Sequence, residues 1–164
     1  VWVELGLQTA SDRTADIINR GYHRETFEKA MEILKSYDIP VVIHLIVGLP
    51  GENMESIKET VEYVNRFAPF GVKIHSIYVM RDTRLCEMYE RGEYVPLTRE
   101  EYIDVLAEAL TYLPPETVIG RVTGDAPAED LLAPEWSRKK LTVIDELDKL
   151  LYETNRWQGM YFLS

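Results

Sequence analysis

The chain has 164 residues, of which 46% are apolar and 28% are charged, and this composition is typical of one globular domain with its own core. A formal net charge of −10 argues against a broad basic surface for nucleic acid, and the single cysteine, Cys86, excludes an internal disulfide framework and a CxxC metal site. No apolar run approaches the roughly 20 residues of a membrane span and no signal peptide is visible, so we expect a cytoplasmic protein. Because the sequence opens directly on a strand pattern without methionine, we expect a fragment of a longer protein.

The hydrophobic pattern predicts alternating strands and helices. Residues 1–8 alternate strictly between apolar and polar, and residues 41–47 form an almost continuous apolar run that is typical of a buried parallel strand. In chain order we expect a strand over 1–8, helices over 11–20 and 24–37, a strand over 41–47, a helix over 53–67, a strand over 72–80, helices over 83–89 and 98–112, a strand over 117–122, an irregular stretch over 123–132, a helix over 134–155 and a docked apolar tail over 157–163.

This order, β-α-α-β-α-β-α-α-β-α, indicates parallel strands joined by right-handed crossovers. Four strands are too few for a closed barrel, so the predicted fold is an α/β half barrel or open sheet with outer helices. The best local signals are N-caps: Ser11 precedes the first helix, and Thr98 with Glu101 forms a capping box before the helix over 98–112.

The turn after the strand at 41–47 is a candidate ligand site. Gly48 and Gly51 follow the strand and a helix begins near Asn53, and α/β proteins hold ligands beyond the carboxyl ends of their strands at such turns. Glycine permits positive φ angles and close approach of a ligand to the backbone. By itself, however, a βα turn with two glycines is more often a tight connection.

Polar side chains recur on one face of every predicted strand. Buried ionisable groups cost several kcal/mol unless they are paired, so four strands that project polar groups towards a shared interior suggest a site. The alternatives are a solvent-facing side of the sheet and a self-satisfied polar core. These polar residues are Glu4, Gln8, His44, Lys73, His75, Arg121 and Thr123.

Single residues within this pattern allow other interpretations. His44 and His75 lie in strands, where hydrogen-bonded core or lumen histidines are more common than metal ligands. Lys73 is a candidate Schiff-base lysine, but it lies near the start of its strand, whereas active sites in barrels lie at the carboxyl ends. We interpret Cys86 as a buried thiol.

Two stretches, ELGLQT at 4–9 and HLIVGLPGE at 44–52, resemble the later barrel strands of radical S-adenosylmethionine (radical SAM) enzymes, and in particular the YhcC-like subgroup that is related to the elongator catalytic subunit. Each of the two stretches is moderately specific for this family by itself, and their order and spacing together are a strong indication of it. Further similar stretches are NRGY at 19–22, KIH at 73–75, LTREEY at 97–102, TGDAP at 123–127 and APEW at 133–136, so that the resemblance spans nearly the whole chain.

The resemblance implies that the chain is a single domain from the C-terminal portion of such an enzyme, with barrel strands 4–6 over 1–80 and a C-terminal region over 81–164. Enzymes of the superfamily reductively cleave S-adenosylmethionine at a 4Fe-4S cluster to make a deoxyadenosyl radical that modifies a substrate. The cluster ligands, three cysteines in a CxxxCxxC-type loop, are absent from this chain, so the fragment alone is expected to be inactive. Analogy with the elongator relatives implies an RNA substrate such as tRNA.

The resemblance also implies the cofactor-binding residues. Glu4 and Gln8 correspond to a motif that contacts the ribose, while the turn after residue 47 and the strand near Ile77 correspond to segments that approach the adenine. His44 departs from the family pattern, which has glycine at that position. An extra residue precedes Glu52, so we expect Glu52 to cap the following helix and not to contact the cofactor. The expected cofactor-binding residues are Glu4, Gln8, His44, Ile46, Gly48, His75 and Ile77, with no metal ligand in this chain.

The resemblance implies the missing N-terminal half of the same protein as a partner, and an open sheet edge at the first strand predicts homodimers. Two alternatives remain open. One is a non-catalytic α/β domain that binds a ligand or another protein, and the other is a complete small lyase that uses Lys73.

Overall fold

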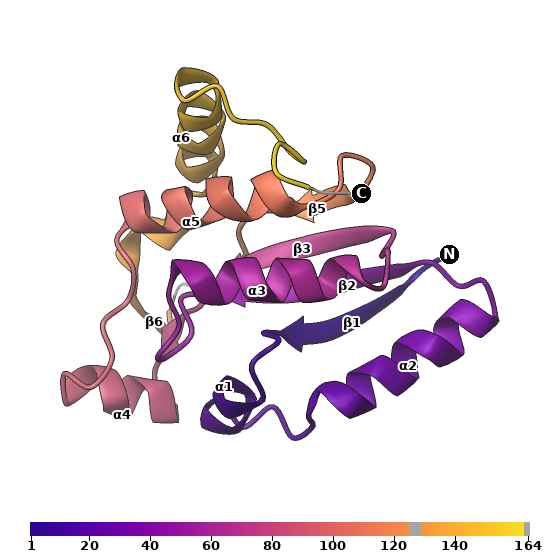
Figure 1. The fold of residues 1–164 in the computed structure, drawn as a ribbon. Coiled ribbons are helices and arrows are strands. Elements are labelled where there is room, and N and C mark those ends of the chain that lie inside the picture. The colour runs from indigo at the N-terminus through magenta and orange to yellow at the C-terminus, as the bar shows by residue number, and fades with distance from the viewer. Residues whose placement is uncertain (125–128, 163–164) are drawn as a thin grey trace.

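The computed structural model describes residues 1–124 and 129–162. Its centre is a four-stranded parallel sheet with the order β1-β2-β3-β5, in which each strand pairs with the next strand of the sheet (Figure 1). This sheet and its outer helices confirm the predicted α/β class. The four strands are β1 (Val3–Gln8), β2 (Val41–Val47), β3 (Gly71–Ser76) and β5 (Val118–Arg121).

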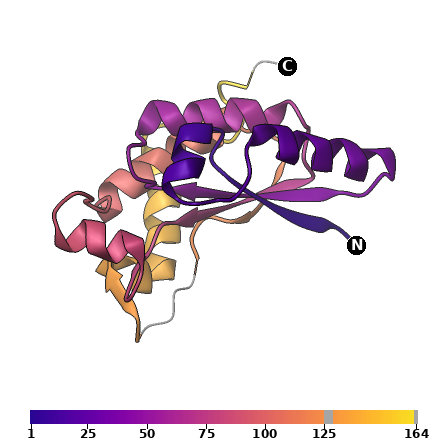
Figure 2. The same cartoon turned by 90° about the horizontal axis from the view of Figure 1, so that it is seen from below.

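Helices cover one face of the sheet and leave the other face open among the described residues (Figure 2). The core lies between that face and α2, α3 and α5, and α6 packs on the outer side of α5. Leu45 of β2 and Ile74 of β3 are completely buried there. The helices are α1 (Asp12–Ile17), α2 (Arg24–Ser36), α3 (Met54–Asn65), α4 (Arg84–Glu90), α5 (Arg99–Tyr112) and α6 (Lys140–Glu153).

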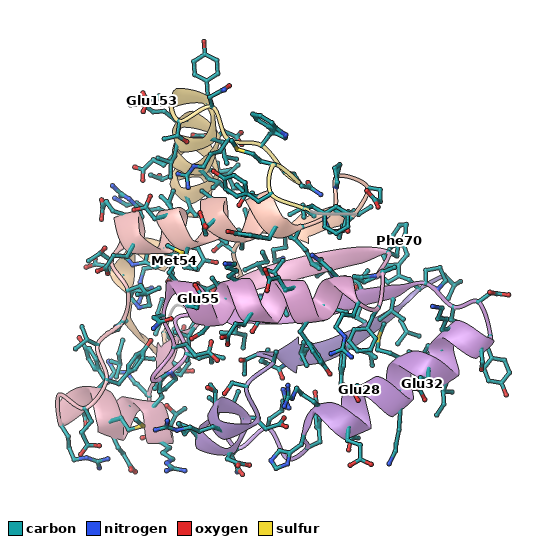
Figure 3. All side chains as sticks on the ribbon, viewed as in Figure 1. Glu28, Glu32, Met54, Glu55, Phe70 and Glu153 are labelled. Carbon is teal, nitrogen blue, oxygen red and sulfur yellow. The ribbon has the colours of Figure 1, made fainter. Side chains whose placement is uncertain are left out.

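Charged side chains lie outside this core, for example Glu55 at the start of α3 and Glu153 at the end of α6 (Figure 3). The alternation read from the sequence explains the arrangement, because Leu5, Val72 and Ile74 face the helices while their neighbours in the chain point to the other side. Among the described residues, no helix combines the length and apolar character needed to cross a membrane.

The helix starts confirm the predicted caps. Ser11 Oγ accepts a hydrogen bond from Thr14 N at 3.1 Å, and Thr98 Oγ1 and the Glu101 carboxylate exchange bonds with each other's backbone N–H groups. The expectation that Glu52 caps the following helix is wrong: Asn53 caps α3, and its side chain accepts from Ser56 N at 3.2 Å. An asparagine side chain is short enough to reach back to the first helical turn, whereas the Glu52 carboxylate bonds elsewhere.

The third predicted strand, 72–80, is wrong at its carboxyl end. β3 ends at Ser76, and the following residues form β4 (Val79–Met80), which pairs antiparallel with β6 (Leu131–Ala133) in a separate two-stranded sheet. Arg81 N extends this pairing by donating to Asp130 O at 2.9 Å. The prediction of an irregular stretch over 123–132 is therefore also wrong at its end, because β6 depends on a partner about fifty residues away that local patterning does not reveal.

The last predicted helix is also divided. A short 3₁₀ helix, η1 (Glu135–Arg138), precedes α6, which begins only at Lys140. Trp136 holds η1 against the core, because its ring packs on Tyr102 and its Nε1 donates to Leu97 O at 2.9 Å. α1 is shorter than predicted and ends at Ile17.

The tail docks as predicted over the residues described. Tyr161 N donates to Thr111 O at 2.8 Å and Gly159 N donates to Leu110 O at 3.1 Å, which ties the tail to the end of α5. Residue 163 of the expected tail and residues 125–127 of the TGDAP stretch lie outside the described residues.

Candidate functional site

The open face of the sheet gathers the predicted polar side chains into a cluster. The Glu4 carboxylate on β1 accepts a hydrogen bond from Lys73 Nζ at 2.6 Å and lies 2.7 Å from His44 Nε2. The sheet register produces this meeting, since His44 pairs with Gly6 on one side and with Lys73 on the other. We call this group the strand cluster; its members are Glu4, His44, Lys73, His75 and Arg121.

Electrostatics fix the charge states of two cluster members. The hydrogen bond from Lys73, with smaller contributions from Trp2 and His44, lowers the pKa of Glu4 to about 2. Burial lowers the pKa of His75 to about 4, and the neighbouring His44, Arg121 and Lys73 reinforce the effect. At neutral pH, therefore, Glu4 is a carboxylate and His75 is a neutral imidazole. The His75 ring stacks on His44, with ring centres 5.3 Å apart.

A cavity of about 640 Å³ lies at the carboxyl ends of β1, β2 and β3. Gln8 and Ile46 line it from the ends of β1 and β2, and Ile77 and Tyr78 line it from the residues just after β3. The remaining walls come from the turn after β2, from the end of α1 and the segment that follows it, and from the start of α4 with the residue before it. This carboxyl-end cavity has the size and the mixture of apolar wall and few polar groups that small-molecule sites have. It lies where open α/β sheets hold ligands.

A local distortion of β1 positions Gln8 in the cavity. The pairing of β1 with β2 shifts register between Gly6 and Gln8, and Gln8 has a positive φ of 61°. Its side-chain amide folds back over Gly6, where an added Cβ would lie only 2.4 Å from Gln8 Nε2. Glycine at position 6 therefore leaves room for the Gln8 amide in this orientation.

Arg20 and Tyr22 hold this end of β1 in place, and sequence reasoning assigned them no role. The Arg20 side chain is 2% exposed, and its NH1 donates to Leu7 O at 2.6 Å and to Thr9 O at 2.8 Å. The Tyr22 hydroxyl donates to Gly6 O. Both residues line the carboxyl-end cavity and belong to the NRGY stretch, which was the available signal.

Gly48 lies behind the cavity wall. Its φ is 91°, and an added Cβ would lie 3.1 Å from Ile77 Cγ2, so the turn after β2 packs directly on that wall. The Tyr94 hydroxyl donates to Gly48 O at 2.7 Å and fixes the turn from the other side. Gly48 also lines a separate hollow of about 310 Å³ between this turn, α3 and α5.

The seven predicted cofactor-binding residues thus fall into three groups. Gln8, Ile46 and Ile77 line the carboxyl-end cavity, and Gly48 backs it. Three others lie in the strand cluster; Glu4 and His44 are nearer the amino ends of their strands than Gln8 and Ile46, whereas His75 lies near the carboxyl end of β3, beside Ile46. The cofactor contacts of all seven residues stay predictions.

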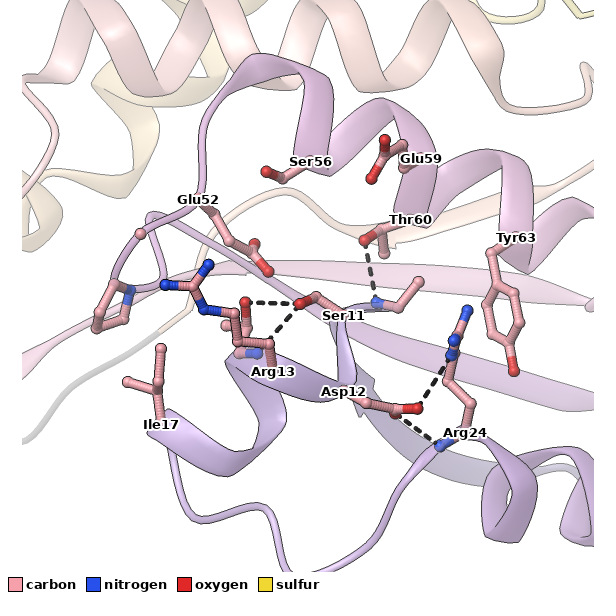
Figure 4. Close-up of a pocket in the computed structure, with 14 residues that line it drawn as sticks. Ser11, Asp12, Arg13, Ile17, Arg24, Glu52, Ser56, Glu59, Thr60 and Tyr63 are labelled. Atoms are coloured by element: carbon pink, nitrogen blue, oxygen red, sulfur yellow. Dashed lines mark hydrogen bonds and ion pairs between the residues drawn. The ribbon is translucent and has the colours of Figure 1, made fainter.

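Glu52 lies in a second pocket, on the helix-covered side between α1 and α3, with a volume of about 630 Å³ (Figure 4). Its carboxylate accepts a hydrogen bond from Thr9 Oγ1 at 2.5 Å, and burial raises its pKa. Nearby, Ala10 N donates to Thr60 Oγ1 at 3.1 Å. These bonds join the turn after β1 to the turn after β2 and to α3, which gives Glu52 a structural role.

The residues present do not fit an iron–sulfur cluster. The only cysteine, Cys86, is buried on α4, and the described part of the chain contains no group of three His, Cys, Asp or Glu side chains able to hold a metal ion. Any cluster ligands in the whole protein would have to come from outside this chain.

The four-stranded parallel sheet with outer helices and a cavity at its carboxyl ends places the chain among α/β domains of the partial-barrel type. Residues 1–64 match the radical SAM superfamily model and residues 69–153 match the radical SAM C-terminal domain model. The chain belongs to the radical SAM superfamily and corresponds to a C-terminal portion of its member proteins.

Individual relatives agree with this assignment. Protein YhcC of Escherichia coli is 34% identical over 93% of this chain and 50% of its own length, and the tRNA uridine(34) acetyltransferase of Methanocaldococcus jannaschii is 36% identical over 77% of this chain and 24% of its own. The solved structure of Methanocaldococcus infernus Elp3 with an N-terminal deletion superposes with a TM-score of 0.84 at 27% identity, covering 96% of this chain and 37% of that one. The chain thus spans about half the length of YhcC. The similarity to YhcC agrees with the predicted YhcC-like subgroup.

Proposed function

We propose that this chain forms the adenosine-binding side of the active site of a radical SAM enzyme and is inactive by itself. The observation that supports the proposal is the carboxyl-end cavity, in which Gln8 of β1, Ile46 of β2 and Ile77, the residue after β3, come together. In the whole protein, a 4Fe-4S cluster held by residues outside this chain would supply the reductive cleavage of S-adenosylmethionine that modifies the substrate.

The chain's own residues would bind and orient the adenosine group. The Gln8 carboxamide offers a donor and an acceptor for ribose hydroxyls, and Ile46 and Ile77 offer an apolar wall for adenine. Arg20 and Tyr22 would keep that geometry by fixing the backbone of β1. The expected partner is the N-terminal half of the protein, which would bring the cluster ligands.

The substrate we propose for the whole protein is RNA, such as tRNA. The support is analogy with the relative whose name is tRNA uridine(34) acetyltransferase, and the net charge of −10 on this chain adds none. The lyase alternative is disfavoured, because Lys73 Nζ donates to Glu4 at 2.6 Å and an ion-paired ammonium group is not a nucleophile.

Calorimetric titration of this chain with S-adenosylmethionine tests the proposal. We expect weak binding, with a Kd of about 1 mM, because the iron chelate that anchors the cofactor is absent. Gln8→Ala should abolish the binding, while Glu55→Gln, an exposed change on α3, should leave it intact. Equal binding by Gln8→Ala and the wild-type chain, or no binding by the wild-type chain, would contradict an adenosine site at Gln8.

A further inference from the structure

The open face of the sheet has an excess of cationic and imidazole groups, although the whole chain is acidic. Lys73 on β3 and Arg121 on β5 are register partners in neighbouring parallel strands. Two histidines, His44 and His75, lie beside them, and Glu4 is the one carboxylate in the strand cluster. Like charges on directly opposed strand positions are unfavourable, and Glu4 offsets only one of these two positive charges.

Arg121 is the charged group in the cluster that has no partner among the described residues. Its side chain is exposed, and it makes no ion pair or hydrogen bond with the described residues. Lys73, by contrast, uses one of its three N–H donors on Glu4 and has two donors left for a ligand. The guanidinium fork of arginine and the point charge of lysine are the two groups that proteins most often use for oxyanions.

Two glycines let the chain around Arg121 pack closely against Lys73 and His75. A Cβ on Gly120 would lie 3.3 Å from Lys73 Cγ, and a Cβ on Gly124 would lie 2.8 Å from His75 Nδ1. At the same place, the buried His75 Nε2 has no hydrogen-bond partner in the parts of the chain that the structure describes. The cluster therefore combines spare N–H donors on Lys73 and Arg121 with an unsatisfied imidazole nitrogen and more positive than negative side chains.

We propose that Lys73, Arg121 and His75 form an oxyanion subsite for a phosphate or carboxylate group of the substrate. The inference rests on the proposed function, because it places the substrate beside the cofactor. His75 is the register partner of Ile46, which lines the carboxyl-end cavity, so an anion at the subsite lies next to that cavity on the same face of the sheet.

Proton NMR of the imidazole rings tests the subsite, because the chain has only three histidines. Inorganic phosphate and acetate are titrated separately at constant ionic strength maintained with chloride. The His44 and His75 signals should shift with saturation, while His23, which pairs with Asp16 between α1 and α2, should not. Tighter binding of phosphate assigns a phosphate ester as the substrate group, and tighter binding of acetate assigns a carboxylate.

Arg121→Gln should weaken the binding of the preferred anion at least about tenfold, because it removes charged hydrogen bonds. Arg13→Gln, which changes an exposed arginine in the pocket of Figure 4, should not. Equal shifts at all three histidines, or unchanged affinity in Arg121→Gln, would overturn the subsite.

The test also separates the subsite from the adenosine site. Arg121→Gln should retain the wild-type affinity for S-adenosylmethionine, and Gln8→Ala should retain the response to the anion. Competition between S-adenosylmethionine and the anion would assign the subsite to the carboxylate of the cofactor and would overturn its assignment to the substrate.

Discussion

The stability of this chain should fall as the pH drops from 6.5 towards 4, and His75 should cause a defined part of the loss. In the folded state the pKa of His75 is lowered from 6.5 to about 4, by burial first and then by the positive groups around it. Because the unfolded chain takes up the proton first, the contribution is fully present above pH 6.5 and is lost as the pH falls through this window.

The size of the effect follows from the two pKa values. A difference from 6.5 to about 4 corresponds to at most about 3 kcal/mol of unfolding free energy. Since the ring is only half-buried, solvent screening reduces the expected loss to about 1–2 kcal/mol. The titratable and charged groups that face the ring are His44, Arg121, Lys73 and Glu4, and Glu4 titrates below this window, with a pKa of about 2.

Urea unfolding of the wild-type chain and His75→Gln at several pH values between 7.5 and 4 measures the effect. Subtracting the unfolding free energies of the two proteins at each pH removes the contribution of the carboxylates, which both proteins share. His23→Gln is the matched control with the opposite sign, because Asp16 raises the pKa of His23 and wild-type His23 therefore stabilises the protein at low pH. Parallel pH dependences for wild type and His75→Gln would refute a buried, neutral His75.

Four further outcomes are expected. Leu45→Ala should lower the unfolding free energy in urea by about 3 kcal/mol, because Leu45 is completely buried in the centre of the sheet, whereas Ile33→Ala on the exposed side of α2 should change it by under about 0.5 kcal/mol. Thr98→Ala should cost about 1 kcal/mol by removing the capping box of α5, and an unchanged urea midpoint would contradict this. Arg20→Gln should cost about 2 kcal/mol or more, because three backbone carbonyls lose a charged donor, and faster amide hydrogen exchange in residues 7–10 would locate the damage. The unpaired edge of β1 should support dimers in sedimentation velocity, and a strictly monomeric species over a wide concentration range would contradict this.

The central elements were predictable because their signals are local. The run at 41–47 is apolar at every position but His44, and only a strand buried beside two neighbours requires that pattern. Thr98 and Glu101 marked the start of α5 because a capping box needs only residues three apart. The shared polar face followed from period-two alternation, since parallel strands in register bring Glu4, His44 and Lys73 together.

The features that the sequence did not predict depend on distant partners. β4 and β6 are two and three residues long, and each is a strand only because it pairs with the other. The cavity wall from α4 comes from a part of the chain far from β1 and β2. The role of Arg20 depends on how the segment after β1 folds back to cover the backbone carbonyls at the end of that strand. Gln8 was assigned to the right face by alternation, but the register shift that lifts it into the cavity requires a positive φ that no periodicity encodes.

The division of the open face into two zones explains which polar atoms need an external partner. Glu4 is paired with both His44 and Lys73, so covering Glu4 and His44 with the other half of a longer protein would leave no unpaired carboxylate, while Lys73 keeps two N–H donors for the subsite. Arg121 and the buried His75 Nε2 are not satisfied within the described residues, and covering them without a ligand would cost the full penalty of an unpaired polar group. If Arg121 is covered in a longer protein, the group that covers it should accept hydrogen bonds and bring negative charge, which is the property that the anion titration measures.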